Sequence, residues 1–552
     1  MIQIKLNFAL SLSILLFLFM ISIKSYGYAE IHYTFWGYSL INRHAPEVIL
    51  DAPWRVESGE PIPILCVVKD ADRFPINLER ITAKCKTEDG KIYTFNIPLE
   101  SQSLNIAEHY WYKLDYIELP YKYAGKLQIT LEAEFTRKGR RKIIISDNLS
   151  GLSHSPFSTF VSSDSLPSID GWFYGDSHYH SDMTQDQVEF GAPVDVAVKM
   201  GKSIGLSWFA VTDHSYDLDI AIGQYFKRDP NHTRWQNIQD EIREANQKYL
   251  DFAVLPAEEV SCGNCRNHNV HLLAFNVPDF IPGSGDGVKN GLLYKKPDLT
   301  IQEVLKLIKD KGGFAYSAHP EIGNGFMGTL LLNRGHWHYK DLILEGSSGM
   351  QFWNGEFNPK FDHSRKTWIN LLLEGRRTYL LGGNDAHGDF NRCRNVKYPN
   401  TILKENENHI FGKVRTFAKC ENGISVSGVF DALKKGKTIV TNGPISILQV
   451  QNDNGKMVDV GGEISGRDFN LIIDSASSDE FGRIEKIDLY KGDLVNQTEN
   501  IEKTFSPVRS DTNKHNFVHK IVYDNPCYVR LEAFSSANGR QYKCFSNPIW
   551  LL

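Results

Sequence analysis

Histidine and acidic residues recur where short apolar runs end in the middle of the chain. The run "WFYGDS" leads into His178 and His180, and "SWFAVT" leads into Asp213 and His214. Further along the chain lie Glu258 and Glu259 ending "FAVLPAEE", His271 within "NVHLLAF", His319 after "FAYSA", and Asp385 and His387 after "YLLGG". Neutral imidazole and carboxylate together are ligands that suit Zn²⁺, Mn²⁺ or Fe. The residue types therefore predict a metal centre.

The spacing and number of these residues favour more than one ion. Two residues at i and i+2 of a strand point to the same face, so His178 and His180 can bind one ion together. Asp385 and His387 repeat this spacing. One ion takes about four protein ligands, and the set is larger than that. A single histidine at a strand end is more often an ordinary polar residue, but recurrence at several strand ends predicts two or three closely placed divalent ions.

The elements that carry these residues alternate between strand and helix patterns. Helix patterns occupy residues 193–204, 233–250, 299–311 and 364–375, between the apolar runs. In the first of them, Val196, Met200 and Ile204 fall on one face. Such alternation predicts a parallel α/β barrel or open sheet. In a barrel of this kind the carboxyl ends of the strands share one mouth, where distant ligands would converge.

The flanking regions have a different pattern, of short alternating strands separated by turns. This pattern is typical of antiparallel sandwiches. The predicted organisation is a signal peptide over 1–29, an N-terminal β-sandwich over 30–165, the α/β region with the predicted metal centre over 166–444 and a C-terminal β-sandwich over 445–552.

Composition limits the partners. The chain has 552 residues, of which 41% are hydrophobic and 23% charged, and its formal net charge is −5. These values are typical of globular proteins. A weakly acidic chain has no global field for binding a polyanion, so no nucleic-acid partner is expected.

The N-terminus predicts export. An uncharged apolar run from Leu6 to Ile23 lies between Lys5 and Lys24, and the small residues Gly27 and Ala29 follow. This layout is typical of a secretory signal peptide cleaved after Gly27 or Ala29. The run is also nearly long enough to span a bilayer, so an uncleaved membrane anchor stays an alternative. We expect a secreted or periplasmic protein, without membrane contact after cleavage.

Export makes the eight cysteines candidates for disulfides. They form local pairs along the chain, and in an oxidising compartment such pairs suggest bridges within separate domains. The predicted bridges are Cys66–Cys85, Cys393–Cys420 and Cys527–Cys544. For Cys262 and Cys265 a small bridged loop is the commonest interpretation, and a redox motif or half of a zinc knuckle is the alternative.

The segments "GDSHYHSD", "FAVTDHS", "PAEEV", "HLLAF", "SAHP" and "GGNDAHGD" resemble the motifs of the polymerase and histidinol phosphatase (PHP) superfamily. The later segments "GKVRTF", "ALKKGKTIVTNGP" and "FSNPIWLL" resemble the branch that includes carbaryl-hydrolase-like and microcin-maturation-like proteins. The resemblance implies a distorted (β/α)₇ barrel with up to three metal ions. It implies a first ion on His178, His180, Glu259 and Asp385, a second on Glu259, His271 and His319, and a third on Asp186, His214 and His387.

Two of these assignments leave alternatives. Asp182 competes with Asp186, because this sequence reads "SDMTQDQ" where the family has Ser-Asp-Gly. Glu258 competes with Glu259, which is preferred because it directly precedes the aliphatic Val260. Asp176 and Asp213 are expected to orient the ligating histidines.

Weaker signals concern the substrate. Arg392, Arg394 and Arg415 could bind an anionic group through forked hydrogen bonds, although surface arginine is the commoner explanation. The Gly/Pro-rich segment 277–298 is either a lid or a surface insertion.

The expected activity is hydrolysis by a metal-activated water, with Glu259 bridging two ions and His214 or His387 assisting the leaving group. The expected substrate is a small-molecule or oligomeric ester, first of all a phosphoester. A carboxyl ester, amide or carbamate is the alternative. A non-catalytic binding or structural protein is the alternative from another class.

Overall fold

The structure is a computed structural model of the chain. It describes residues 45–120, 122–148, 154–184, 191–222, 227–283, 296–321, 333–355, 359–392, 395–398, 401–404, 409–507, 513–523 and 525–552. The predicted signal peptide lies outside these ranges. In the part of the chain that is described, no helix is both long enough and apolar enough to span a membrane.

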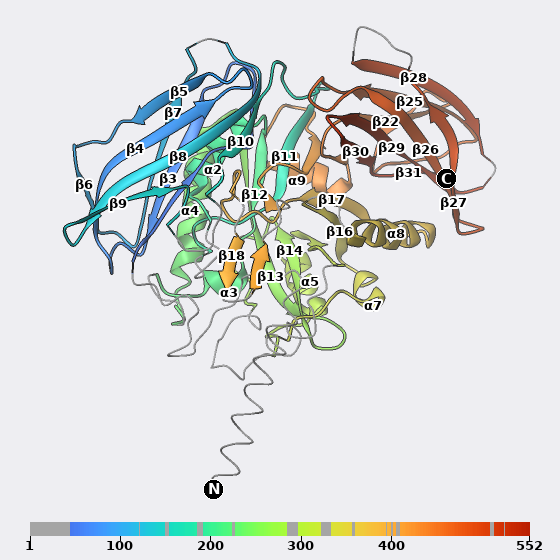
Figure 1. Cartoon of the computed structure of the whole chain (residues 1–552). Coiled ribbons are helices and arrows are strands. Elements are labelled where there is room, and N and C mark those ends of the chain that lie inside the picture. Colours follow the sequence, from blue (N-terminus) through green and yellow to red (C-terminus); the bar gives the residue numbers. More distant parts are fainter. Residues whose placement is uncertain are drawn as a thin grey trace, which may run out of the picture.

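The N-terminal region folds into two packed sheets, drawn in blue in Figure 1. One sheet contains β1 (Glu47–Asp51), β3 (Ile62–Lys69) and β7 (Tyr110–Ile117) in the order β1-β3-β7. The other runs in the order β2-β10-β8-β4-β5, with β6 and β9 at its margins. Its strands are β2 (Arg55–Val56), β4 (Ile76–Lys86), β5 (Ile92–Ile97), β6 (Leu104–Ile106), β8 (Gly125–Arg137), β9 (Arg140–Ile145) and β10 (Phe157–Val161). In β4 and β8 buried residues largely alternate with more exposed ones, so one face of the sheet packs on the core.

A curled sheet in the middle of the chain carries the strand ends that the sequence singled out. Its order is β17-β16-β15-β14-β13-β12-β11. The strands are β11 (Trp172–Tyr179), β12 (Trp208–Val211), β13 (Ala253–Gly263), β14 (Asn269–Phe275), β15 (Phe314–Ser317), β16 (Ser347–Asn354) and β17 (Tyr379–Gly383). Each contains a run of buried residues, which explains their nearly continuous apolar sequences.

Seven helices are present among the described residues. They are α2 (Val194–Ser203), α3 (Ser215–Leu218), α4 (Thr233–Lys248), α5 (Ile301–Asp310), α7 (Tyr339–Leu342), α8 (Pro359–Leu373) and α9 (Val426–Lys435). The four helices predicted from periodicity correspond to α2, α4, α5 and α8, so their existence is confirmed. At the start of α5, Thr300 and Glu303 cap each other's backbone amides, which fixes where the helix begins.

The predicted (β/α)₇ barrel is wrong as a description of this chain. Strand β14 runs antiparallel to both of its neighbours, β13 and β15, and no helix separates β13 from β14. Only five residues connect them, which allows a hairpin but not the long crossover that a parallel pair needs. The strand at the other end, β11, pairs antiparallel with β20 (Arg415–Lys419). The chain is therefore mostly β, with a mixed, curled sheet in place of a repeating barrel.

The same sheet continues into the C-terminal region. Strand β21 (Thr438–Thr441) pairs with β20 and with β30 (Arg540–Ser546), and the order runs on as β29-β26-β27. These strands are β26 (Ile484–Asp493), β27 (Thr498–Phe505) and β29 (Cys527–Ala537), with β24 (Glu463–Ile464) and β31 (Ile549–Leu551) beside them. A four-stranded sheet comprises β23 (Met457–Asp459), β22 (Ile445–Asn452), β25 (Asp468–Ala476) and β28 (Lys514–Val522). A separate hairpin comprises β18 (Asn395–Tyr398) and β19 (Thr401–Lys404).

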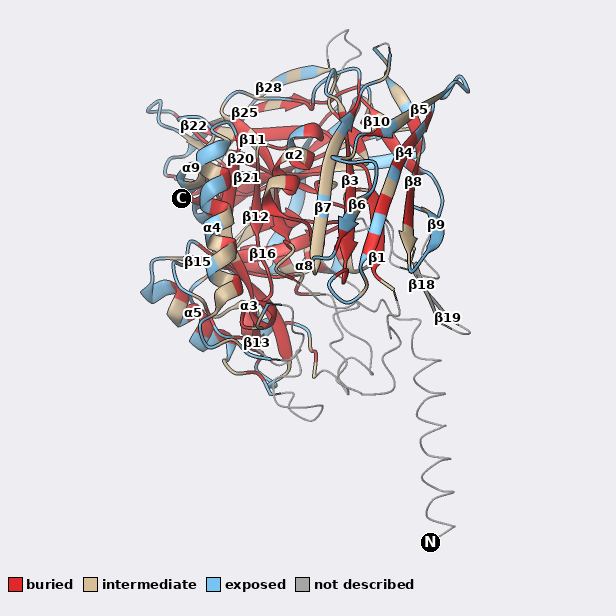
Figure 2. Ribbon diagram, turned by 90° about the vertical axis from the view of Figure 1, so that its left-hand side faces the viewer, coloured by how far each residue is buried: buried red, intermediate tan, exposed pale blue. Residues whose placement is uncertain are grey.

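The middle of the molecule is buried from several sides. Figure 2 shows the central sheet as mostly buried, with α4 and α9 exposing one face. Large side chains such as Trp208, Trp353 and Trp368 are fully buried there. The polar residues that the strand ends carry therefore lie inside a shielded core, where charged groups need partners.

The predicted disulfides are not present among the seven cysteines that the structure describes. Cys527 and Cys544 lie on neighbouring strands, but Cys544 is opposite Ala533, six residues along β29 from Cys527. At about 3.3 Å per residue this is about 20 Å, too far for a disulfide. Cys66 and Cys85 lie buried on strands of different sheets. The Cys262 thiol donates to the carbonyl oxygen of Val270 at 3.6 Å. Cys393 lies outside the described residues.

Candidate metal centre

The carboxylate of Glu259 lies at the centre of a group of imidazoles. Its Oε2 is 3.2 Å from His178 Nε2 and 3.3 Å from His180 Nε2. The same oxygen is 3.0 Å from His214 Nδ1. Its Oε1 is 2.9 Å from His271 Nδ1 and 3.0 Å from His319 Nε2. One buried carboxylate thus meets different histidines with its two oxygens.

The first group of ligand atoms belongs to His178, His180, Glu259 and Asp385, all of them buried. Asp385 Oδ1 is 3.2 Å from His178 Nε2 and 3.0 Å from His180 Nε2. The two Nε2 atoms are 3.1 Å apart. Zinc-to-ligand bonds of about 2.0–2.1 Å in a tetrahedron give ligand-to-ligand edges of about 3.3–3.4 Å. The four side chains therefore fit a divalent ion with little movement.

The remaining histidines form two further groups around Glu259 and His180. His214 and His271 form a second group with this carboxylate, and His180, His214 and His387 form a third. The rings of His180 and His387 are stacked with their centroids 4.1 Å apart. His319 also approaches Asp385, at 3.7 Å from Oδ2. His214 belongs to both the second and the third group, whereas the resemblance placed it with the third ion alone.

The strand ends hold these residues through backbone pairing. The amide of Asp385 donates to the carbonyl oxygen of His178, and that of His180 donates to the carbonyl oxygen of Ala386, both at 2.9 Å. Residues about 200 positions apart in sequence are thereby fixed side by side. His319 and Asp385 both have left-handed backbone, with φ of 27° and 56°. Such strained conformations in non-glycine residues cluster at functional sites.

Two amide side chains, Gln351 and Asn354, support the first group. Gln351 Oε1 is 2.8 Å from His178 Nδ1. Gln351 Nε2 donates to Asn354 Oδ1 at 3.0 Å, and Asn354 Nδ2 donates to Asp385 Oδ2 at 3.3 Å. If His178 Nδ1 carries the proton, Nε2 is left bare toward the first group, as metal binding requires. The available signal was a glutamine inside the apolar run "GMQFW".

The two aspartates expected to orient histidines make other contacts. Asp176 accepts hydrogen bonds from the backbone amides of His178, Asn384 and Gly412 and from the Asn384 side chain. Asp213 accepts from the amide and hydroxyl of Ser181 and from the Thr184 hydroxyl. The hydrogen bonds of both residues thus hold the segments that carry the candidate ligands.

Glu258 and Glu259 point to opposite faces of β13, as neighbouring strand residues do. Glu258 Oε2 accepts from the Ile281 amide at 3.1 Å, away from the imidazoles. Burial raises the pKa of Glu258 well above its usual range. For Glu259, burial acts in the same direction, but the charges of His271, His178 and His214 outweigh it and hold its pKa well below the usual range. Glu259 is thus the residue of this pair that stays negatively charged.

The imidazoles respond to the same charges. Burial lowers the pKa of His178, but Asp385 and Glu259 overcome this and raise it to about 9. The pKa of His214 is also raised to about 9, where burial is outweighed chiefly by Glu259. The negative charge of the two buried carboxylates favours protonated histidines. The same charge can hold divalent cations in place of these protons.

Arg334 is a cation beside the centre that the sequence analysis missed. Its backbone lies next to Asn269 on β14, two residues before His271. Burial lowers its pKa to about 10, and the charge of Asp385 opposes this decrease. An isolated arginine in a loop has no sequence pattern that would mark it as part of a site.

The other predicted residues lie elsewhere. Arg392 is buried and binds Asp389, at 2.7 Å between Nη2 and Oδ1. Arg415 is fully buried, with its guanidinium 5.5 Å from the Tyr174 ring and 5.3 Å from the Phe481 ring. These contacts belong to packing between regions of the chain. Asp186, Arg394 and residues 284–295 of the suggested lid lie outside the described residues. Asp182 is described, but no group of candidate ligands includes it.

Comparisons with known proteins identify no family. No family model matches the chain, and no curated protein matches it. Among solved structures, a glycosyl hydrolase family 2 member from Bacteroides cellulosilyticus is 8% identical over 91% of this chain, with a TM-score of 0.15. Bacteroides uniformis beta-glucuronidase 2 is 9% identical over 93%, with a TM-score of 0.18. The chain spans 62% of the length of each. TM-scores this low carry no argument about fold or activity.

Proposed function

We propose that the protein is a metal-dependent hydrolase whose first substrates are phosphoesters. The observation that supports this most is the position of Glu259. Its Oε2 faces His178 and His180, and its Oε1 faces His271 and His319. A carboxylate with imidazoles on both oxygens is the arrangement that bridges two divalent ions.

Each ligand has a defined part in this proposal. His178, His180, Glu259 and Asp385 would hold the first ion, and Glu259 with His271 and His319 would hold the second. His214 and His387 remain for a third ion or for proton transfer to the leaving group. Divalent ions bound here would activate water and stabilise the negative charge of the transition state.

The chain's own residues prepare the site for this chemistry. Glu259 stays ionised, so it can hold two cations close together. Gln351 and Asn354 fix the first group from behind. Arg334 adds a buried positive charge close to Asp385. Together with the ions it would attract a phosphate group, which favours phosphoesters over uncharged esters.

The motifs support the same proposal. The ligand-bearing segments resemble those of the PHP superfamily, whose members include phosphoesterases. The described sheet is not a repeating barrel, so the support comes from the ligand segments and their order alone.

A substrate panel tests the function. Protein stripped with a chelator and reloaded with Mn²⁺ or Zn²⁺ is assayed on p-nitrophenyl phosphate, bis-p-nitrophenyl phosphate, p-nitrophenyl acetate and a carbamate ester. We expect metal-dependent release from a phosphate ester and at least about 10-fold lower kcat/KM on the acetate. Faster turnover of the acetate or carbamate would identify a carboxyl hydrolase. Tight metal binding without turnover of any substrate would favour a binding protein.

A further inference from the structure

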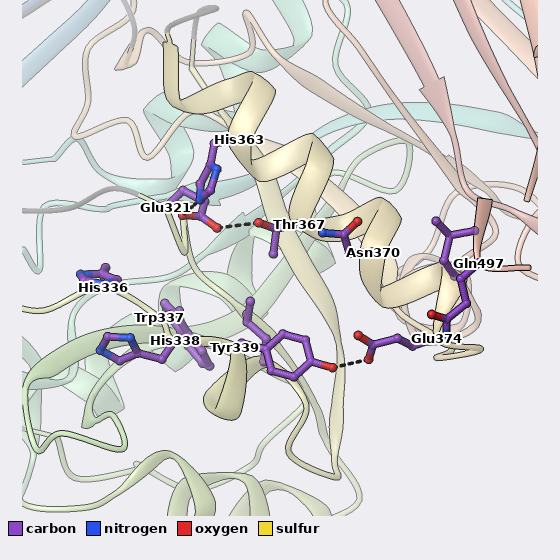
Figure 3. Close-up of a pocket in the computed structure, with 12 residues that line it drawn as sticks. Glu321, His336, Trp337, His338, Tyr339, His363, Thr367, Asn370, Glu374 and Gln497 are labelled. Carbon is purple, nitrogen blue, oxygen red and sulfur yellow. Dashed lines mark hydrogen bonds and ion pairs between the residues drawn. The ribbon is translucent and has the colours of Figure 1, made fainter. Parts of the chain in front are cut away.

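A pocket of about 430 Å³ lies beside the metal centre (Figure 3). Its walls come from the loop after His319, the segment 336–339, helix α8 and the residue before β27. Its size lies within the usual range for small-molecule sites. The residues that line it are Glu321, His336, Trp337, His338, Tyr339, Leu342, His363, Thr367, Asn370, Leu373, Glu374 and Gln497.

The pocket and the metal centre share part of their walls. Trp337 lines the pocket, and its indole Nε1 donates to the carbonyl oxygen of His271 at 3.2 Å. The Trp337 amide donates to the carbonyl oxygen of Pro320, also at 3.2 Å. Pro320 directly follows His319, and Glu321 comes next. A substrate with its ester at the metal centre could therefore extend into this pocket.

The lining is polar and mixes hydrogen-bond donors with acceptors. Glu321 accepts from the Thr367 hydroxyl at 2.9 Å, and Tyr339 donates to Glu374, as the dashed lines in Figure 3 show. Figure 3 also shows Asn370 on α8 between these two pairs. Aromatic rings of His336, Trp337 and Tyr339 complete the surface. Hydroxyl groups, which both donate and accept, match such a lining.

The charges at the pocket are compensated. His363 Nε2 is 3.1 Å from Glu321 Oε2, and the half-buried Lys360 interacts with the same carboxylate. Arg376 Nε is 3.2 Å from Glu374 Oε2. Among the described residues that line the pocket, the cationic candidates are histidines, and the nearby Lys360 and Arg376 already interact with Glu321 and Glu374. The two carboxylates in the lining would repel a second phosphate or a carboxylate. An uncharged ligand fits better than an ionic one.

We infer that this pocket binds the alcohol part of the substrate, and that this part is uncharged and polyhydroxylated, like a sugar. The inference rests on the proposed function for the ester-cleaving step. The pocket itself can be tested without that step. The inference places substrate specificity in α8 and in the segment 336–339, which contain none of the proposed metal ligands.

Two matched substrates test the inference. Glucose 6-phosphate and cyclohexylmethyl phosphate are both primary alkyl phosphates with a six-membered ring, but only the first has ring hydroxyls. On the metal-loaded protein we expect kcat/KM for glucose 6-phosphate to be at least about 10-fold higher, which corresponds to about 1.4 kcal/mol. We expect 6-phosphogluconate, which adds a carboxylate, to be a poorer substrate than glucose 6-phosphate.

Asn370→Leu replaces the amide by an apolar group with the same number of non-hydrogen atoms and should lower the ratio of the two kcat/KM values at least about 3-fold. Lys366→Leu is the control, since Lys366 is exposed on the same helix and does not line the pocket. Equal kcat/KM for the two substrates, on protein that hydrolyses p-nitrophenyl phosphate, would overturn the inference.

A binding measurement separates this inference from the proposed function. Methyl glucoside and cyclohexylmethanol are titrated separately, with binding followed by saturation-transfer NMR. We expect methyl glucoside to bind, cyclohexylmethanol to bind more weakly, and Asn370→Leu to weaken methyl glucoside alone. Inactivity on every phosphate ester, with this pattern intact, would overturn only the proposed function. Absence of methyl glucoside binding to the wild-type protein would overturn the inference, whatever the activity.

Discussion

Gln351 Oε1 lies 2.8 Å from Nδ1 of His178, and both side chains are fully buried. An amide oxygen can only accept, so Nδ1 of the ring donates to Gln351. Nε2, which faces Glu259 and Asp385, is then the nitrogen that can bind an ion once it has lost its proton. This contact orients a ligand without being a ligand itself.

Replacing Gln351 with Leu should weaken the first ion's binding about 10- to 100-fold, because His178 loses the partner that fixes its tautomer. Isothermal titration of the chelator-stripped protein with Zn²⁺ measures this change. Gln236→Leu, at an exposed position on α4, is the control and should bind like wild type. An unchanged affinity in Gln351→Leu would show that the contact has no orienting role.

Glu259→Gln should lower kcat for p-nitrophenyl phosphate at least about 10³-fold, because it removes the negative charge that would hold two cations together. Glu258→Gln is the matched control on the same strand. Burial raises the pKa of Glu258 well above its usual range, which favours its neutral carboxyl, and glutamine has nearly the same shape. Steady-state kinetics and metal analysis of both variants check this prediction. If Glu258 were the ligand, Glu258→Gln would lose activity and metal, and Glu259→Gln would keep both.

The sequence predicted much of the site because each ligand follows or lies within an apolar run that becomes a buried strand. This rule alone was enough to predict the positions of His178 and His180 at the end of β11 and of Asp385 after β17. Gln351 and Arg334 could not be predicted, because their roles depend on which strand or loop lies beside them. The antiparallel β14 was also missed, since a buried strand has the same apolar sequence in either direction. Local apolar runs reveal strands, but pairing partners are set by tertiary packing.

The prediction of a Cys527–Cys544 disulfide failed for a similar reason. Proximity along the chain was taken as proximity in space, yet the register of β29 and β30 keeps Cys527 and Cys544 far apart. Register depends on cross-strand packing, which spacing in the sequence does not report.

The N-terminal and C-terminal regions should depend on each other for stability. Arg55 is fully buried, and its Nε is 2.8 Å from Glu480 Oε2. Glu480→Gln would leave a buried guanidinium with only Glu57 as an ionic partner, at a cost of up to about 3–5 kcal/mol. The exposed pair of Arg377 and Glu463 offers a control, and Glu463→Gln should cost less than about 1 kcal/mol. Urea unfolding measures both changes, and equal values would argue against the buried junction.

Metal binding should release protons and strengthen as the pH rises. Without an ion, Asp385 and Glu259 overcome the effect of burial and raise the pKa of His178 to about 9, and Glu259 does the same for His214. Both rings are therefore protonated at pH 7 in the metal-free protein, whereas an ion binds only the neutral ring. Each proton that must leave weakens the apparent affinity below pH 9, so the affinity should increase from pH 6 to about 9 and then level off. Calorimetric titration with Zn²⁺ at pH 7, in buffers of different ionisation enthalpy, should detect release of at least about one proton per chain. An affinity that does not change between pH 6 and 9, with no proton release, would show that these histidines are not metal ligands.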